Sequence, residues 1–334
     1  MKVGKQTYVL DNDVYIADTY TIAGPLEGDG NYGEYYDLVL EDDLWECKSH
    51  EKTEIKMHKE AISLLLEHSK LQENEIDALF GGDLLNQIIT TSFSAREFEI
   101  PFIGMYEACS TFGECMAIAS MLISAGYMKK VICATSSHYG SAERQYRFPL
   151  ELGTQSPPTA QWTVTGTGAT LLSSEKQENC PKVCSVTIGK IIDFGVDNVN
   201  NMGGAMAPAA YHTINQHLSD LGRKPSYYDM IITGDLGKFG VDLLHYIASC
   251  DNLELASVLN DCGALIYHPD QKVVQGGSGA GCSSLLFNSY FYKEMKNGSF
   301  KKILLVPTGA LLSKLSSLQG ESIPAVAHAI DIEM

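Results

Sequence analysis

The chain has 334 residues, of which 45% are hydrophobic and 19% are charged, and its formal net charge is −17 at pH 7. This length and composition predict a folded globular protein with a large core and exclude a disordered chain. The negative charge excludes general nucleic-acid binding, which needs clustered Lys and Arg, and it disfavours direct adhesion to anionic lipid.

The nine cysteines show no spacing typical of a metal site, and several lie among small or apolar residues, as buried reduced thiols do. The first residues contain no apolar run long enough for a signal peptide. No stretch approaches the roughly 20 apolar residues that a transmembrane helix needs. We therefore expect a protein that is made and kept in a cytoplasm.

The first half of the chain alternates short apolar runs with helical patterns. In chain order, the predicted elements are a helix at 49–70, a strand at 76–80, a buried helix of small residues at 109–126, and strands at 131–136 and 169–173. The segment 137–165 is too long and too rich in Pro, Ser and Gln for an ordinary turn. Long irregular segments of this kind tend to be binding loops.

The second half repeats the alternation. Its predicted elements are a strand at 228–233, a helix at 283–296, a strand at 303–307 and a final strand at 325–330. Strands that alternate with helices indicate an α/β fold with mostly parallel strands.

Two stretches of sequence occur twice. Residues 76–84 (IDALFGGDL) return as 228–236 (YDMIITGDL), and residues 126–135 return as 298–308 with one insertion. A repeat of this length predicts two similar half-domains with a pocket between them. We place the halves at 1–178 and 179–334, with the boundary within 175–186.

A possible nucleophile lies at the start of the buried helix in the first half. A cysteine at a helix N-terminus is expected to have a lowered pKa, because unpaired backbone N–H groups favour the thiolate. The matching position in the second half, 276–279 (GGSG), offers no thiol. Cys109 is therefore a candidate nucleophile, with an unreactive core thiol as the alternative.

This combination of a duplicated βαβαβαββ half, a cysteine and a Gly-rich counterpart resembles the thiolase superfamily, which includes thiolases and ketoacyl condensing enzymes. Over nearly its whole length the chain resembles the stage V sporulation protein AD family. The segments that carry this resemblance are 82–87 (GDLLNQ), 108–111 (ACST), 134–138 (ATSSH), 142–145 (AERQ), 205–210 (AMAPAA), 233–236 (TGDL), 276–279 (GGSG) and 321–324 (ESIP). The resemblance implies an α/β thiolase-like fold with two pseudo-symmetric halves in a layered α-β-α-β-α arrangement.

The resemblance also implies a function. It predicts a non-catalytic protein that binds dipicolinic acid, or its calcium chelate, and supports its uptake into the developing spore. It further predicts a homodimer at the inner membrane of the forespore or spore, within a transport assembly. The sequence offers no anchor and no basic face, so attachment is expected through other stage V sporulation membrane proteins. The alternative is a thiolase-like acyltransferase or condensing enzyme that uses Cys109 as its nucleophile.

The residues around the expected active centre favour the non-catalytic function. A condensing enzyme needs a second-half His, and an Asn or second His, to stabilise the developing oxyanion. The first of these positions reads 233–235 (TGD) and the second reads 277–279 (GSG), so both lack the needed side chain. An Asp near the reacting carbonyl would also repel an enolate. We therefore expect no condensation activity.

Other polar residues suit a small planar dicarboxylate. Arg144 and Arg147 lie close together in the long segment, and the guanidinium fork of Arg pairs with a carboxylate. Calcium that accompanies the anion could be bound by oxygen ligands such as Asp83, Asn86 or Asp235. No other cofactor is expected. The complete predicted ligand site is Cys109, His138, Arg144, Arg147, Asp83, Asn86, Asp235, Ser278 and His328.

Each of these assignments has a structural alternative. The two arginines could form surface ion pairs with Glu143 and Glu151. His138 and His328 could be hydrogen-bonded structural residues. The two aspartates, which recur at matching positions of the repeat, could cap turns.

Overall fold

A computed structural model describes residues 1–146 and 157–334 of the chain. Ten strands form one hydrogen-bonded path in the order β11-β10-β13-β16-β9-β2-β8-β6-β4-β5. Their bounds are β2 (Thr7–Ala23), β4 (Ala78–Gly82), β5 (Phe102–Gly104), β6 (Lys130–Ser137), β8 (Gly166–Ser173), β9 (Lys182–Thr187), β10 (Met230–Thr233), β11 (Leu259–Asp261), β13 (Lys302–Val306) and β16 (Ala329–Glu333). The short strands β1 (Lys2–Val3) and β3 (Leu38–Val39) pair with β2, β7 (Trp162–Thr163) pairs with β12 (Gly277–Ser278), and β14 (Thr308–Ala310) pairs with β15 (Ala325–Ala327).

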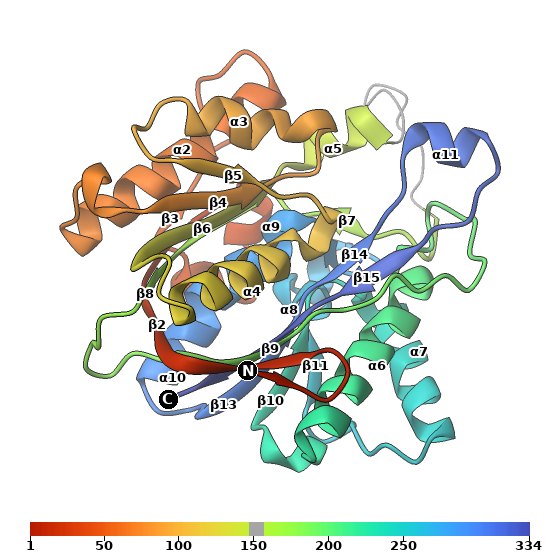
Figure 1. The fold of residues 1–334 in the computed structure, drawn as a ribbon. Coiled ribbons are helices and arrows are strands. Elements are labelled where there is room, and N and C mark those ends of the chain that lie inside the picture. The colour runs from red at the N-terminus through yellow and green to blue at the C-terminus, as the bar shows by residue number, and fades with distance from the viewer. Residues whose placement is uncertain (147–156) are drawn as a thin grey trace.

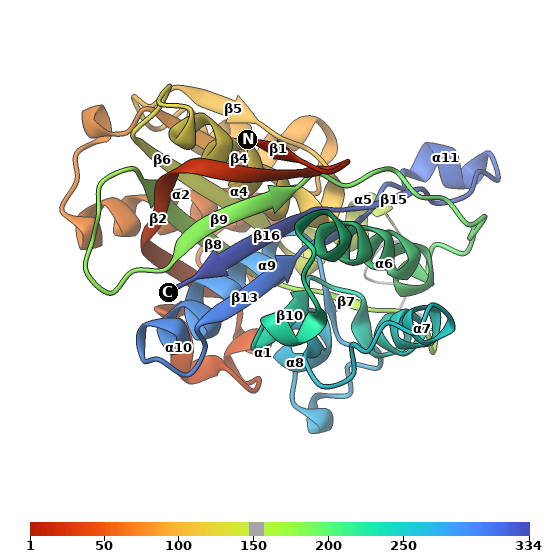
Figure 2. The same ribbon diagram turned by 60° about the horizontal axis from the view of Figure 1, so that its bottom comes forward.

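The two halves of the sheet have matching strand arrangements when each is followed from the centre of the sheet to its edge. In the first half it runs β2-β8-β6-β4-β5, and in the second it runs β9-β16-β13-β10-β11. In both, the first two pairings are antiparallel and the last two are parallel. Figure 2 shows β2, β9, β16 and β13 side by side across the junction. The duplicated α/β fold predicted from the sequence is confirmed, and the exact boundary between the halves stays a prediction.

The helices form three layers around this sheet (Figure 1). On the outside of the first half lie α2 (His50–Ser69) and α3 (Ile89–Ala95), and on the outside of the second half lie α6 (Met202–Leu221) and α7 (Gly237–Cys250). Between the two halves lie α4 (Thr111–Ser124) and α9 (Ala280–Leu286). The remaining α-helices of the described residues are α1 (Pro25–Gly28), α5 (Tyr139–Tyr146), α8 (Cys262–Ile266), α10 (Tyr292–Lys296) and α11 (Lys314–Leu318). None of the helices in this part of the chain is both long and apolar enough to cross a membrane.

Alternating side chains on each strand separate the core into layers. On β13, Ile303 and Leu305 pack in the central cluster with Phe112 of α4, whereas Leu304 and Val306 face the cluster around α6. Strand residues point alternately to opposite faces, so a strand covered on both sides is apolar throughout. Each fully buried Ile or Leu contributes about 1.5–3 kcal/mol. This packing holds α4, and the turn before it, at a fixed place between the halves.

Local signals explain where α2 begins and ends. The hydroxyl of Ser49 accepts a hydrogen bond from the Lys52 backbone N–H, which satisfies one of the free donors of the first turn. Lys70 then adopts a left-handed conformation with φ of 56°, and the helix ends there. The helix predicted at 49–70 is therefore confirmed.

Three predicted elements differ in detail. The helix predicted at 283–296 begins earlier, as α9, and continues through a π-helical turn (Phe287–Phe291) into α10. The final strand is divided at His328 into β15 and β16. The segment 137–165 contains α5 and β7 among its described residues, so it is not irregular throughout.

Candidate functional site

The predicted nucleophile lies in a tight turn between the two halves of the molecule. Cys109 is the middle residue of a 3-10 turn (Ala108–Ser110) that leads directly into α4. The preceding Ala108 has φ of 51°, a conformation that costs a non-glycine residue about 1–3 kcal/mol. The thiol side chain is nearly buried, with 6% of its surface exposed.

The second half places a carboxylate against this thiol. Asp235 follows β10 and is fully buried, and its carboxylate lies near enough to the Cys109 thiol to raise the pKa of that thiol. The Thr308 hydroxyl donates to Asp235 Oδ1 at 2.7 Å, and the Gly279 backbone N–H donates to Oδ2 at 3.1 Å. Two donors therefore fix the carboxylate beside the sulfur atom.

Glycine is required at position 279 of this arrangement. Gly279 has φ of +113°, which L side chains rarely adopt, and a Cβ atom there would lie 2.5 Å from Ser137 Oγ. The Gly-rich turn of the second half therefore brings its backbone close enough to donate to Asp235.

The electrostatics of the pair contradict one expectation. Burial raises the pKa of the Cys109 thiol well above its ordinary value, and the adjacent Asp235 carboxylate raises this pKa further. The Gly279 N–H acts in the opposite direction but does not overcome burial. The prediction that the helix N-terminus lowers the Cys109 pKa is therefore wrong, because burial and a carboxylate outweigh it. Burial likewise raises the pKa of Asp235 to about 7.

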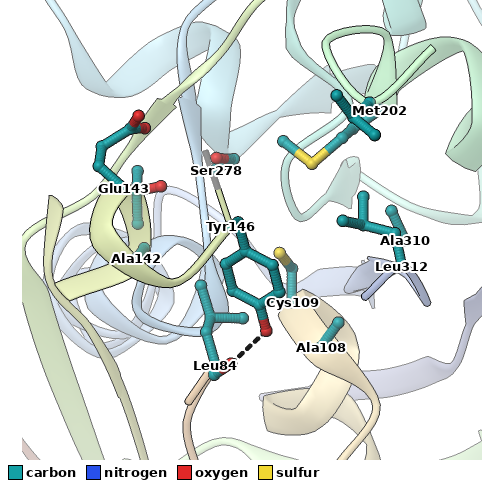
Figure 3. A pocket seen from close by; sticks show the side chains of 12 residues that line it. Leu84, Ala108, Cys109, Ala142, Glu143, Tyr146, Met202, Ser278, Ala310 and Leu312 are labelled. Atoms are coloured by element: carbon teal, nitrogen blue, oxygen red, sulfur yellow. Dashed lines mark hydrogen bonds between the residues drawn. The ribbon is translucent and has the colours of Figure 1, made fainter. Parts of the chain in front are cut away.

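A pocket opens in front of the thiol (Figure 3). Its lining is Leu84, Ala108, Cys109, Ala142, Glu143, Tyr146, Thr163, Val199, Met202, Ser278, Ala310 and Leu312, and its volume including the open mouth is about 550 Å³. The walls are mostly apolar. Among the described residues, the lining contains one charged side chain, Glu143, and no Lys, Arg or His.

One wall of the pocket is the helix α5. It contributes Ala142, Glu143 and Tyr146, which Figure 3 shows opposite Met202 of α6 and Ala310 of β14. The Tyr146 hydroxyl donates to the backbone carbonyl of Leu84, which ties α5 to the turn after β4. Strands and helices from both halves thus enclose one cavity, as the repeat predicted.

Of the nine predicted site residues, Cys109 and Ser278 line the pocket. Asp235 lies behind the lining and acts on the site through its charge, which raises the pKa of the Cys109 thiol. Arg147 lies outside the described residues. The other five lie elsewhere.

His138 is held away from the pocket lining. Its Nδ1 accepts a hydrogen bond from the Gly140 N–H at 3.0 Å, and its Nε2 donates to the Asp43 carbonyl at 2.8 Å. Burial lowers the pKa of His138 to about 4. Both ring nitrogens are used inside the fold, as expected for a structural histidine.

Asp83 caps a buried turn. Its carboxylate accepts hydrogen bonds from the Leu85 N–H and from the N–H and hydroxyl of Thr91, each at 2.8 Å. The repeat therefore preserved an aspartate at both strand ends, but only Asp235 contacts the cysteine.

Arg144 and Asn86 line a separate, open hollow on the surface. The Arg144 guanidinium pairs with the Glu51 carboxylate at 3.0 Å, not with Glu143 as the surface alternative supposed. The Asn86 backbone N–H donates to Gln145 Oε1 at 3.0 Å.

Calcium binding by Asp83, Asn86 or Asp235 stays a prediction, and two of these side chains already have hydrogen-bond partners. The carboxylates of Asp83 and Asp235 are both occupied by hydrogen-bond donors. In residues 1–146 and 157–334, no group of three His, Cys, Asp or Glu side chains is placed to hold a metal ion.

His328 contacts the residue that precedes the cysteine turn. Its Nε2 contacts the Glu107 carboxylate, and its Nδ1 accepts a hydrogen bond from the Gly189 N–H at 3.1 Å. Glu107 is the residue that precedes the Cys109 turn. His328 therefore lies behind the site and does not line the pocket.

The predicted site omitted Glu143 and Thr308, together with most of the apolar residues of the lining. The first lies in the segment 142–145, which carried the family resemblance, so that segment was a usable signal. Thr308 ends a repeated stretch, but its contact with Asp235 depends on tertiary structure.

Known proteins resemble this chain at two levels. The sequence pattern of the family described as stage V sporulation protein AD (SpoVAD) matches residues 4–333. The stage V sporulation protein AD of Bacillus subtilis (strain 168) is 41% identical over 330 residues, which cover 99% of this chain and 97% of that protein.

Solved structures show the fold. Cerulenin-bound OleA of Xanthomonas campestris matches with a TM-score of 0.62 and 12% identity, over 97% of each chain. The tetronic acid condensing enzyme AbyA1 matches with a TM-score of 0.56 and 13% identity, over 84% of this chain and 87% of that one. These likenesses confirm the α/β thiolase-like fold. The match to the family pattern over nearly the whole chain, together with the Bacillus relative, shows that this chain belongs to the stage V sporulation protein AD family.

Proposed function

We propose that this sporulation protein is a non-catalytic member of the thiolase-like fold that binds dipicolinic acid, or its calcium chelate, in the pocket beside Cys109. The observation that carries this proposal is the contact between the Cys109 thiol and the Asp235 carboxylate. The binding step supports uptake of the ligand into the developing spore.

The contact with Asp235 opposes condensation chemistry. A nucleophilic cysteine acts as the thiolate, and the reaction then needs neutral or positive donors for the oxyanion. Here the nearest acidic group disfavours the thiolate, and no histidine lines the pocket among its described residues. The thiol is therefore expected to remain protonated and to contribute shape and a weak hydrogen bond.

The pocket suits a flat ring that carries carboxylates. Its apolar walls can contact both faces of the ring, and the N-terminus of the 14-residue helix α4 favours negative charge near Cys109. In the calcium chelate the metal offsets part of the charge of the ligand, which lowers the cost of placing it between apolar walls. Arg147 remains a proposed partner for a carboxylate.

The proposal includes an assembly. The net charge of −17 disfavours direct adhesion to an anionic membrane, so we place the protein at the spore inner membrane through other stage V sporulation membrane proteins. A homodimer remains part of this proposal.

Calorimetric titration with dipicolinate, with and without calcium, tests the ligand and the pocket together. We expect Ser278→Leu, which adds an apolar side chain to the lining, to weaken binding at least about tenfold, a loss of about 1.4 kcal/mol. The matched control is Arg96→Ala, because this side chain lies outside the lining and pairs with Glu97, and its affinity should equal that of the unmodified protein. Absence of binding by the unmodified protein would refute the ligand, and equal losses in both variants would refute the location.

The enzyme alternative is tested by incubation with acyl-CoA donors followed by mass spectrometry. We expect no acylated Cys109 and no turnover. A stable acyl adduct on this sulfur together with turnover would instead establish the acyltransferase.

A further inference from the structure

The helix α5, which forms one wall of the pocket, is fastened to the first turns of α2 by two polar contacts. The outer contact is the ion pair between Arg144 and Glu51, and both side chains are partly exposed to solvent. The inner contact joins Ser141 Oγ to Glu54 Oε2 at 2.5 Å and is completely buried. The two glutamates are one turn apart on α2, so both contacts hold the same pair of helices.

The geometry of the inner contact indicates that Glu54 carries a proton. Ser141 Oγ also lies 3.0 Å from the backbone carbonyl of His138, and a hydroxyl has only one hydrogen to donate. The carbonyl can only accept. Both contacts are hydrogen bonds at once if Glu54 carries a proton and donates it to Ser141. The other carboxyl oxygen of Glu54 accepts from the Ser136 hydroxyl at 3.2 Å, which completes the arrangement.

The acidic neighbour of Glu54 explains why the proton is retained. Asp83, at the end of β4, accepts three hydrogen bonds and therefore holds the negative charge of this buried region. Glu54 is 1% exposed, and its carboxyl group forms no ion pair with the described residues. Burial, with the charge of Asp83 next, raises the pKa of Glu54 to about 8.

Among the described residues, the other ionisable groups near Glu54 form no ion pair with it. Glu51 on α2 is paired with Arg144 on α5. His58, one turn further along α2, is buried, and burial lowers its pKa to about 4. His138, which follows β6, also has a pKa lowered to about 4 by burial, and its ring centroid lies 5.0 Å from that of His50 at the start of α2. None of these groups supplies a cation to an ionised Glu54.

We infer that Glu54, in its protonated form, is a positioning residue that holds α5 against α2 and thereby fixes the pocket wall that carries Glu143 and Tyr146. When the proton leaves, Ser141 must donate to Glu54 and its hydrogen bond to the His138 carbonyl is lost. Glu54 and Asp83 then carry two buried negative charges that repel one another, and this repulsion weakens the attachment of α5 although Ser141 still contacts Glu54. The consequence for ligand affinity rests on the proposed function, whereas the attachment itself does not.

The attachment is tested without any ligand. Trp162 stacks on Tyr139, the first residue of α5, with ring centroids 3.7 Å apart and planes at 5°. The chain has two tryptophans, so Trp45→Phe leaves Trp162 as the reporter in full-length protein. We expect its fluorescence to change with a midpoint near pH 8.

Two isosteric variants identify the group that titrates. Glu54→Gln keeps a donor for Ser141 and an acceptor for Ser136, so it should abolish the fluorescence transition while the protein stays folded. Glu51→Gln removes only the outer ion pair and should leave the transition in place. A transition that persists in Glu54→Gln, or its absence in the parent, would overturn the inference.

Calorimetric titration with dipicolinate then extends the test to the pocket. Above pH 8 the affinity of the parent should fall by up to about tenfold per pH unit, because binding must restore the proton. Glu54→Gln should hold its affinity across this range, and Glu54→Ala should bind more weakly at every pH. A parent that shows the fluorescence transition but binds no dipicolinate refutes the proposed function alone. A parent that binds dipicolinate without any transition refutes the role of Glu54 alone.

Discussion

At the scale of single residues, the site depends on burial more than on sequence position. Cys109 could be placed at a helix N-terminus from its neighbours in the chain, and this placement is correct. The direction of the Cys109 pKa shift could not be predicted from the sequence, because Asp235 is 126 residues away and meets the thiol only through the packing of the two halves. The structural role of His138 could not be predicted either, because its hydrogen bonds to Asp43 and Gly140 depend on the folded conformation.

Removal of the carboxylate beside the thiol should make the thiol more reactive. In Asp235→Asn, the negative charge that raises the Cys109 pKa is gone, so we expect alkylation by iodoacetamide at pH 8 to be several times faster. Asp83→Asn is the control, because this aspartate occupies the matching place in the repeat and contacts no cysteine. Equal rates for Asp235→Asn and the unmodified protein would show that the carboxylate does not govern the thiol.

The protonated glutamate also predicts a dependence of stability on pH. The pKa of Glu54 rises from 4.5 in the unfolded chain to about 8 in the folded protein. Its contribution is therefore complete below pH 4.5 and is lost as the pH rises through 8. The difference in free energy of unfolding between Glu54→Gln and the unmodified protein should therefore shift in favour of Glu54→Gln as the pH rises from 5 to 8. The shift should amount to a few kcal/mol, at about 1.4 kcal/mol per pKa unit. Urea unfolding at both pH values measures this gain, and an equal difference at both would contradict it.

At the scale of elements, the sequence predicts those helices and strands whose local signals agree with their tertiary environment. The helix α2 has an apolar stripe, a serine cap and a left-handed end, so its bounds could be predicted closely. The strand β2 has Asp11, Asn12 and Asp13 in its middle, which resemble a turn, and it was not predicted. The helix α6 contains Gly203, Gly204 and Pro208, and it too was missed. Long-range packing overrides weak propensity in both elements.

The turn that carries Gly279 offers a test of an element that the site requires. Gly279→Ala combines a positive φ with a Cβ atom 2.5 Å from Ser137 Oγ, so it should lower the free energy of unfolding by about 1–3 kcal/mol. Gly298→Ala is the matched control, because Gly298 also has a positive φ of +85° but has open space around it. Urea unfolding of the two variants separates steric crowding from backbone strain. Equal losses would show that the close approach to Ser137 has no effect.

At the scale of the whole molecule, duplication explains both the fold and its asymmetry. The repeated stretches 76–84 and 228–236 contain β4 and β10, which occupy matching places in the mirrored strand order. The repeat therefore predicted the architecture. It could not predict how the halves divide the site, because that division depends on which loops meet: the first half supplies the thiol and α5, and the second supplies Asp235, Gly279 and Thr308.

The most direct test of the account is a crystal structure of the full chain grown with calcium dipicolinate. The account predicts the ring in the pocket between α5 and β14, beside an unmodified Cys109 sulfur. Ligand density only in the hollow near Arg144, or a covalent adduct on the sulfur, would contradict it.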